Sequence, residues 1–175
     1  MKLFPVIAAI VVAAIAARSA HSQEKKAELV PVKYEGLKQE LLKHRGKVVI
    51  VDFWASNCDP CRKKFPFFVE LHEKYAAKGL VVISVSVDPA VQLEENIAEG
   101  IAAAKRFIEK QQPPFRNLLL DESAATVTKH FGFKGLPFYY FFDRKGNWIR
   151  FRAADPGGVP YDKLDELVVK MLDGK

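Results

Sequence analysis

Runs of apolar residues, separated by Gly and Pro, divide most of the chain into short predicted strands and helices. Two runs, residues 47–54 (KVVIVDFW) and 80–87 (LVVISVSV), have the length and the β-branched content of strands buried on both faces. Elsewhere the apolar residues recur at helical spacing, and Gly79 follows one such segment as a helix-ending residue. We expect helices at residues 37–44, 60–78, 92–111, 122–131 and 161–172, and strands at 47–54, 80–87, 118–120, 137–142 and 147–151.

The order of these elements predicts the class of fold. Strands and helices alternate as far as residue 131, which indicates parallel strands joined by helices. Residues 143–146 (DRKG) then predict a hairpin turn between the last two strands, and a helix closes the chain. With 175 residues, the chain is long enough for one domain with a substantial core. The pattern therefore predicts an α/β domain with a central mixed β-sheet and helices on both faces.

The first 22 residues have the layout of a secretory signal peptide. Lys2 supplies a positive start, residues 3–17 are almost entirely apolar, and Ala20 and Ser22 are small residues suited to cleavage. The apolar run is shorter than the roughly 20 residues that span a bilayer, although an uncleaved, membrane-associated N-terminal segment is the alternative. We expect cleavage after Ser22, an N-terminal arm at 23–33, the domain at 34–175, and an extracytoplasmic location, either periplasmic or secreted.

Composition and charge exclude several classes of protein. Hydrophobic residues make up 49% of the chain, which excludes a disordered or fibrous protein. The 27 Lys and Arg outnumber the 21 Asp and Glu, for a net charge of +6. This excess is spread along the chain without a basic helix or an RNA-binding motif, so we expect no nucleic-acid partner. It would instead suit contact with an anionic membrane surface or an acidic partner.

Both cysteines of the chain, Cys58 and Cys61, lie in a C-x-x-C motif between a predicted buried strand and a predicted helix. Unpaired backbone N–H groups and the helix dipole favour negative charge at the start of a helix. They lower the pKa of a cysteine there to roughly 3.5–7.5, and the thiolate is the reactive form. We therefore expect Cys58 to attack a disulfide and Cys61 to resolve the mixed disulfide. Pro60 fits the first helical turn, where its missing N–H is not needed.

Other uses of the cysteine pair are weaker on physical grounds. A structural bridge that closes so short a loop restrains the unfolded chain by only about 2 kcal/mol. Structural zinc needs four ligands, and the sequence contains no second C-x-x-C and no suitably spaced pair of histidines. Copper delivery through the two thiolates is the alternative function, and a permanently bridged interaction domain is a third. We expect no bound metal and no cofactor other than the redox-active disulfide.

The surroundings of this pair resemble the thioredoxin superfamily. Residues 51–61 (VDFWASNCDPC) resemble the active-site segment of thioredoxins, and residues 135–137 (GLP) resemble their cis-proline loop. The spacing between the two resembles the extracytoplasmic TlpA/ResA-like branch, whose members carry an inserted strand–helix segment at that place. The resemblance covers residues 34–172. It implies a thioredoxin-like fold with this insertion and a thiol–disulfide oxidoreductase.

The resemblance also implies roles for single residues around the cysteines. Asp52 matches the buried acidic residue beneath the second cysteine. A carboxyl group in an apolar strand has a raised pKa and can exchange a proton with Cys61. Pro137 matches the cis-proline that faces the disulfide, where the backbone of Leu136 would pair with an extended substrate chain.

Four further residues complete the expected site. Trp54 and Asn57 are assigned to the substrate-binding surface, and Asn57 stands where thioredoxins usually have Trp. Asp59 and Pro60, between the cysteines, are expected to tune the redox potential. The Asp59 carboxylate opposes formation of the neighbouring thiolate, which favours the disulfide and predicts a reductant.

The resemblance also implies partners. Substrates would be the thiols and disulfides of other proteins, among them apocytochromes in cytochrome c maturation or proteins of copper-site assembly. A membrane thiol reductase would return the protein to its reduced form, and we expect the protein to be a monomer.

Overall fold

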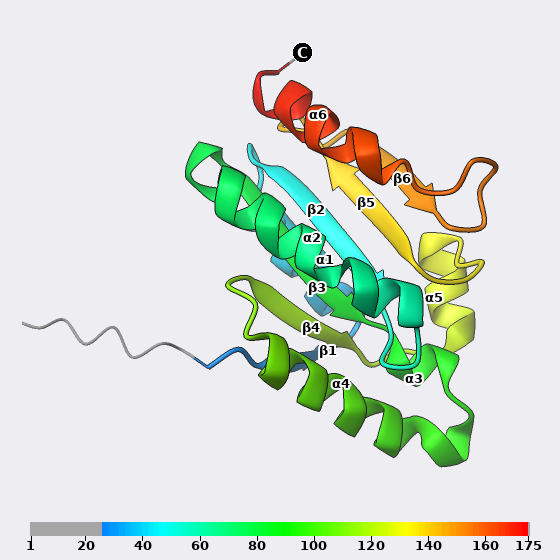
Figure 1. Ribbon diagram of the computed structural model, residues 1–175. Helices are drawn as coiled ribbons and strands as arrows, with labels where there is room; N and C mark the ends of the chain where they lie inside the picture. Colours follow the sequence, from blue (N-terminus) through cyan, green and yellow to red (C-terminus); the bar gives the residue numbers. More distant parts are fainter. Residues whose placement is uncertain (1–25, 175) are drawn as a thin grey trace, which may run out of the picture.

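A six-stranded β-sheet organises the computed structural model, which describes residues 26–174 (Figure 1). The strand order is β1-β4-β3-β2-β5-β6. The first four strands in this order run parallel, whereas β5 is antiparallel to β2, and β6 to β5. The strands are β1 (Leu29–Val32), β2 (Val48–Trp54), β3 (Leu80–Ser86), β4 (Arg116–Leu120), β5 (Phe138–Phe142) and β6 (Trp148–Arg152). The predicted mixed sheet is confirmed, and the predicted signal peptide at 1–22 lies outside the described residues.

Helices cover both faces of the sheet, as Figure 1 shows. On one face lie α1 (Tyr34–Leu42), α3 (Asp88–Val91) and α5 (Ala124–Phe131), and on the other α2 (Asp59–Tyr75), α4 (Ile97–Gln111) and α6 (Tyr161–Leu172). Alternation along β2 separates two cores: Val51 and Phe53 pack under α1 and α5, whereas Ile50 and Trp54 pack on the opposite face. Asp52 shares the parity of Ile50 and Trp54, and therefore lies on the face that α2 covers.

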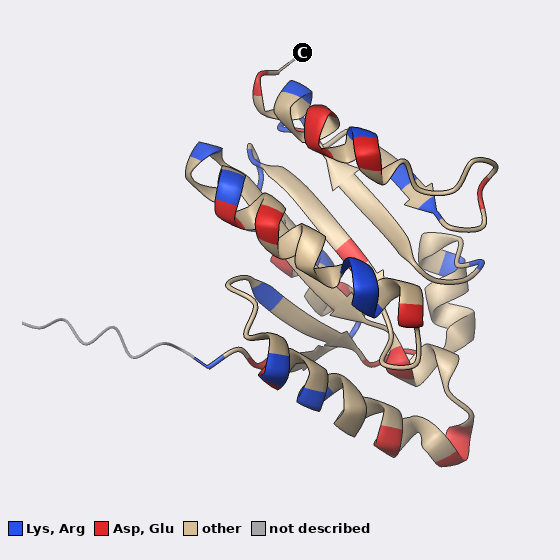
Figure 2. Ribbon diagram, viewed as in Figure 1, with Lys and Arg blue, Asp and Glu red and all other residues tan. Residues whose placement is uncertain are grey.

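Charged residues lie mainly on the helices and loops, while the strands of the sheet carry few of them (Figure 2). All seven residues of β2 are buried, which is the expected environment of a central strand with parallel and antiparallel neighbours. No helix among residues 26–174 is long and apolar enough to cross a membrane.

The prediction of one continuous helix at 92–111 is wrong for its first residues. The chain forms α3, then a short 3₁₀ turn (Glu94–Asn96), and only then α4. Gln92 and Leu93 have extended backbone between these pieces. The Gln92 side chain donates a hydrogen bond to Asp88 (3.2 Å) and packs against Gly100, where a Cβ would lie 2.7 Å from Gln92 Cγ. This contact turns the chain back on itself before α4 begins.

The predicted N-terminal arm at 23–33 contains the first strand of the sheet. Residues 29–32 form β1, which pairs in parallel with β4 at one edge. Pro31 is compatible with this strand because an edge strand has one side without a partner. Leu29 is buried in the same cluster as Trp54 and Cys61, so the segment contributes to the core beneath the cysteine pair.

The remaining predicted elements are confirmed to within a few residues. The helix expected from residue 37 begins at Tyr34, and the one expected at 60–78 is α2 followed by a 3₁₀ turn (Ala76–Lys78). Gly79 then ends this segment with φ 99°, a left-handed conformation that suits glycine.

Candidate active site

Cys58 and Cys61 are joined by a disulfide at the N-terminus of α2, as the motif predicted. Cys58 is the residue that caps the helix, and its Sγ accepts a hydrogen bond from the backbone N–H of Cys61 at 3.3 Å. Cys58 is partly exposed, whereas Cys61 is only 3% exposed. A thiol from solvent can therefore reach the first sulfur, while the second is enclosed by the core. The N–H group that points at Cys58 also favours negative charge on that sulfur after reduction.

Asp52 is buried on the face of β2 that α2 covers, and is 2% exposed. Burial raises the pKa of its carboxyl group to about 8, so the group is mainly protonated at neutral pH. Tyr139 lies opposite Asp52 in the β2–β5 register, and its hydroxyl is 2.6 Å from that of Tyr161 on α6. Burial is the largest cause that raises the pKa of each tyrosine. The surroundings of Asp52 therefore favour neutral groups.

Trp54 does not lie on the surface to which the sequence analysis assigned it. Its side chain is 0% exposed and packs against Phe65 and Phe107, with ring centroids 5.8 and 4.9 Å away. The reason is its parity on β2, which directs the indole into the core shared with Cys61. Trp54 therefore packs in the core beside the buried cysteine and presents no surface to a substrate.

The other predicted site residues surround the cysteines at the surface. Asn57, Asp59 and Pro60 are all exposed. The Leu136–Pro137 peptide bond is cis, which confirms the prediction for this loop. Leu136 is partly buried and packs on the same cluster as both cysteines.

Asp59 carries its charge next to a cation. Its carboxylate accepts a hydrogen bond from the guanidinium of Arg62, one turn further along α2. This contact holds the pKa of Asp59 below its usual value, so the carboxylate is ionised. Because Arg62 and Asp59 are both exposed, water screens much of their effect on Cys58.

Asp88 is a residue of the site that the sequence analysis missed. Its carboxylate is fully buried and accepts hydrogen bonds from the backbone N–H of Ser56 (3.1 and 3.0 Å) and from the Ser56 hydroxyl. It also accepts from the Ser86 hydroxyl (2.7 Å) and from Gln92. Ser56 stands two residues before Cys58, so Asp88 ties the β2–α2 loop to the start of α3. A signal was present in the sequence, because an acidic residue directly follows a buried strand.

The three histidines among residues 26–174 lie in packing environments that do not involve the cysteines. His72 contacts Phe115, His130 stacks on Tyr34 at 3.7 Å, and His44 lies 3.7 Å from Glu40. Among residues 26–174, no group of three or more His, Cys, Asp or Glu side chains is arranged to hold a metal ion.

Comparisons with known proteins agree with this geometry. A family model described as the AhpC/TSA family matches residues 19–150. The thiol-disulfide oxidoreductase ResA of Bacillus cereus is 28% identical over 157 residues, which cover 86% of this chain and 82% of ResA. The crystal structure of a Chlorobium tepidum protein assigned as the thiol:disulfide interchange protein DsbE is 29% identical. It superposes with a TM-score of 0.54 over 75% of this chain and 84% of that one.

A solution structure from Bacteroides vulgatus, assigned as a thiol-disulfide oxidoreductase, gives a similar result. It is 30% identical, with a TM-score of 0.51, and covers 74% of this chain and 78% of its own. The family model spans more than half of the chain, and these relatives carry the activity that the disulfide at the start of α2 implies. The chain therefore belongs to the AhpC/TSA family and is a thioredoxin-like thiol–disulfide oxidoreductase.

Proposed function

We propose that the protein works outside the cytoplasm and reduces disulfides in other proteins, in cytochrome c maturation or a similar assembly process. The observation that carries the proposal is a disulfide with one partly exposed sulfur at a helix N-terminus and one buried sulfur. The signal-peptide layout of residues 1–22 supports the location. The resemblance to the TlpA/ResA-like branch supports the process, and a membrane thiol reductase would supply the electrons.

In the proposed reaction, the Cys58 thiolate attacks one sulfur of a substrate disulfide. A mixed disulfide forms, and the other substrate sulfur leaves as a thiolate. Cys61 then loses its proton and attacks Cys58 Sγ, which releases the second substrate sulfur. The substrate gains two electrons and the protein becomes the Cys58–Cys61 disulfide. A dithiol of the reductase must reverse this last change before the next cycle.

The buried position of Cys61 explains why a proton acceptor is needed at this site. A thiolate in an apolar core is costly, so Cys61 must lose its proton as it attacks and regain one when the bridge is reduced. Asp52 is a buried titratable group on the same side of the sheet, and its pKa of about 8 lies near physiological pH. We assign this proton exchange to Asp52.

Substrate contact is proposed for the exposed surface next to Cys58. Asn57 is exposed and directly precedes Cys58 in the chain, and Leu136 packs on the cluster that contains both cysteines. The backbone of Leu136 would pair with an extended segment of the substrate, as in the addition of a strand to a sheet edge.

The first prediction tests the exchange of disulfides with protein substrates. Cys61→Ser removes the thiol that resolves a mixed disulfide on Cys58. Adducts should therefore accumulate when the reduced variant is mixed with extracytoplasmic extracts. They are detected as species that disappear on treatment with dithiothreitol and are identified by mass spectrometry. Cys58→Ser is the matched control and should trap nothing. An absence of adducts, together with tight one-to-one binding of Cu(I) by the wild type, would favour copper delivery instead.

The second prediction concerns the pH dependence that Asp52 produces. When dithiothreitol attacks Cys58, the Cys61 thiolate leaves and can take a proton from Asp52, which is protonated below about pH 8. Wild type should therefore react about tenfold or more faster than Asp52→Asn near pH 6, as is typical of general acid catalysis. Above pH 8 the ionised carboxylate has no proton to give and opposes the leaving thiolate, so this ratio should fall to about one or below.

The ratio of the two rates removes the titration of dithiothreitol itself, because that titration is common to both proteins. Stopped-flow measurement of the two reduction rates between about pH 6 and pH 10 gives this ratio. A ratio that stays constant over this range would assign the proton to another group.

The third prediction concerns Asp88 as a positioning residue. Ser56→Ala removes a hydroxyl that donates to Asp88, and should lower the free energy of unfolding by about 1–3 kcal/mol. It should also change the pKa of the Cys58 thiol in the reduced protein, because the loop that sets the sulfur against the helix is loosened. Absorbance of the thiolate against pH measures this pKa.

Ser123→Ala is the matched control, because Ser123 caps α5 with a hydrogen bond to the Thr126 N–H. It should cost about 1 kcal/mol of stability without changing the Cys58 pKa. Equal effects of the two substitutions on that pKa would reduce Asp88 to a structural role.

The fourth prediction tests the direction of electron flow. If the Asp59 carboxylate disfavours the Cys58 thiolate, Asp59→Asn should raise the reduction potential. Arg62→Gln should lower it, since it removes the cation that offsets this carboxylate. Equilibration with glutathione measures both potentials. An unchanged or lower potential in Asp59→Asn would show that the charge of Asp59 does not tune the pair.

A further inference from the structure

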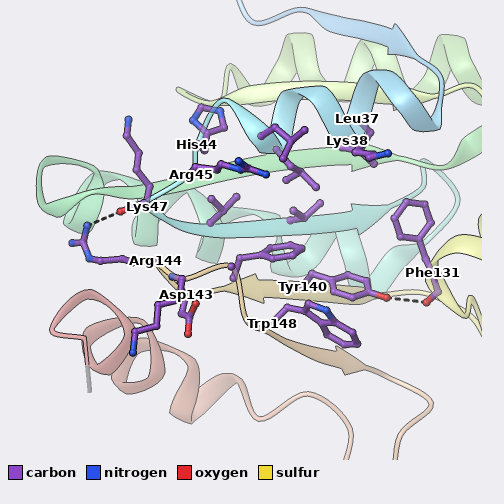
Figure 3. A pocket seen from close by; sticks show the side chains of 18 of the residues that line it. Leu37, Lys38, His44, Arg45, Lys47, Phe131, Tyr140, Asp143, Arg144 and Trp148 are labelled. Carbon is purple, nitrogen blue, oxygen red and sulfur yellow. Dashed lines mark hydrogen bonds between the residues drawn. The ribbon is translucent and has the colours of Figure 1, made fainter.

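A groove of about 710 Å³ lies on the face of the sheet opposite the disulfide (Figure 3). Its floor is formed by residues of β2 and β5, among them Val51 and Phe142. One wall is α1, with Leu41, and the other is the edge strand β6, with Trp148. The volume falls within the range of small-molecule sites, which is roughly 300–1,000 Å³.

One end of this groove is cationic. Arg45 and Lys47, in the loop after α1, line this end, and so do Arg144 and Lys145 of the β5–β6 turn. Arg144 donates hydrogen bonds to the carbonyl oxygens of Gly46 (3.1 Å), Lys78 (3.2 Å) and Leu172 (3.4 Å). The turn is thus held against the loop, and both groups of cations occupy the same end.

The charge at this end has little compensation. Arg45, Lys47 and Lys145 form no side-chain hydrogen bond or ion pair with any residue from 26 to 174. Asp143 is the single carboxylate among the described residues that line the groove. It accepts hydrogen bonds from the backbone N–H groups of Lys145 (2.8 Å) and Asn147 (2.9 Å) and from the Asn147 side chain, so it serves the turn.

The rest of the groove is lined mainly by apolar and aromatic side chains and is incompletely covered. Trp148 is 55% exposed and Leu42 is 39% exposed, and both line the groove. Exposed apolar surface that continues into a hollow is typical of a binding site. An acidic peptide would carry charges along its length, whereas here the unpaired cations lie at one end. Lys38 lines the groove on the side of Phe131, and its charge is paired with Glu35 at 3.3 Å. The arrangement matches a molecule with one anionic head and one apolar tail.

We propose that this groove binds a single-chain anionic amphiphile, namely the free form of a long-chain carboxylate. The carboxylate lies among Arg45, Lys47 and Lys145, and the chain lies along the apolar floor beside Trp148. The site is separate from the disulfide, so the proposal does not depend on the redox function.

Dodecanoate is the probe, added to the full chain in its oxidised form at concentrations below micelle formation. We expect saturable one-to-one binding by calorimetry, with a change in the fluorescence of Trp148. Decanoate should bind about tenfold more weakly, because two methylene groups fewer are buried. Dodecanol, which lacks the charge, should bind about fivefold or more weakly than dodecanoate.

Variants at the cationic end separate the head from the tail. The combined Arg45→Gln, Lys47→Gln and Lys145→Gln variant should lose about fivefold or more of its affinity for dodecanoate and keep its affinity for dodecanol. The matched control removes three exposed lysines of α4 and α6, with Lys105→Gln, Lys110→Gln and Lys170→Gln. It should bind dodecanoate as wild type does, and both variants should reduce insulin at the wild-type rate.

Four results would overturn the proposal. One is equal binding of dodecanoate by the two triple variants, and another is equal affinity of the wild type for dodecanoate and dodecanol. The third is binding to phosphatidylglycerol vesicles without binding to free dodecanoate, which would make a membrane surface the occupant. Self-association that depends on Trp148, with no binding of the probe, would likewise assign the groove to a second copy of the chain.

Discussion

The junction between β2 and α2 is the constraint on which the rest of this structure depends. The chain must leave a strand buried on both faces and begin a helix at Cys58, within four residues of Trp54. This junction places one sulfur at the boundary with solvent, facing the N–H groups of the first helical turn. The same turn carries Cys61 into the core. The difference in exposure between the two sulfurs therefore follows from the path of the backbone.

Two buried carboxyl groups near this junction have different environments. Asp88 accepts hydrogen bonds from Ser56, Ser86 and Gln92, and so fixes the loop that leads to Cys58. Asp52 has an apolar and aromatic environment, and burial alone raises its pKa to about 8. A carboxylate with many donors suits a structural support, whereas a carboxyl group that titrates near neutral pH suits proton exchange. Asp88 lies at the start of α3, just after β3, and Asp52 lies within β2.

Local patterns were enough to predict much of the fold, and long-range contacts account for what they missed. The strand at 47–54 and the helix at 161–172 follow from the spacing of apolar residues, and both were found close to their predicted bounds. β1 could not be recognised in this way, because a four-residue strand with a proline depends on β4, far away in the sequence. The break before α4 depends on the contact between Gln92 and Gly100, which helical spacing does not reveal.

The candidate site, like the fold, was predicted only in part from the sequence. The motif alone predicted the disulfide, and the resemblance predicted the cis bond before Pro137. The assignment of Trp54 to the substrate-binding surface is wrong, because its side chain is buried. The alternation of β2 directs it inward, and this alternation could have been used in advance.

The alternation of β2 also explains how one sheet can carry two separate sites. Side chains of one parity, Asp52 and Trp54, face the side of the sheet that α2 covers, and Trp54 packs in one cluster with both cysteines. Those of the other parity, such as Val51, face α1, where the hairpin of β5 and β6 leaves part of the sheet uncovered. A ligand in that groove would touch the face of β2 opposite Asp52 without entering the core around Cys61. β2 ends at the cysteine loop and β5 begins directly after Pro137, so both strands of the groove floor connect such a ligand with the redox site.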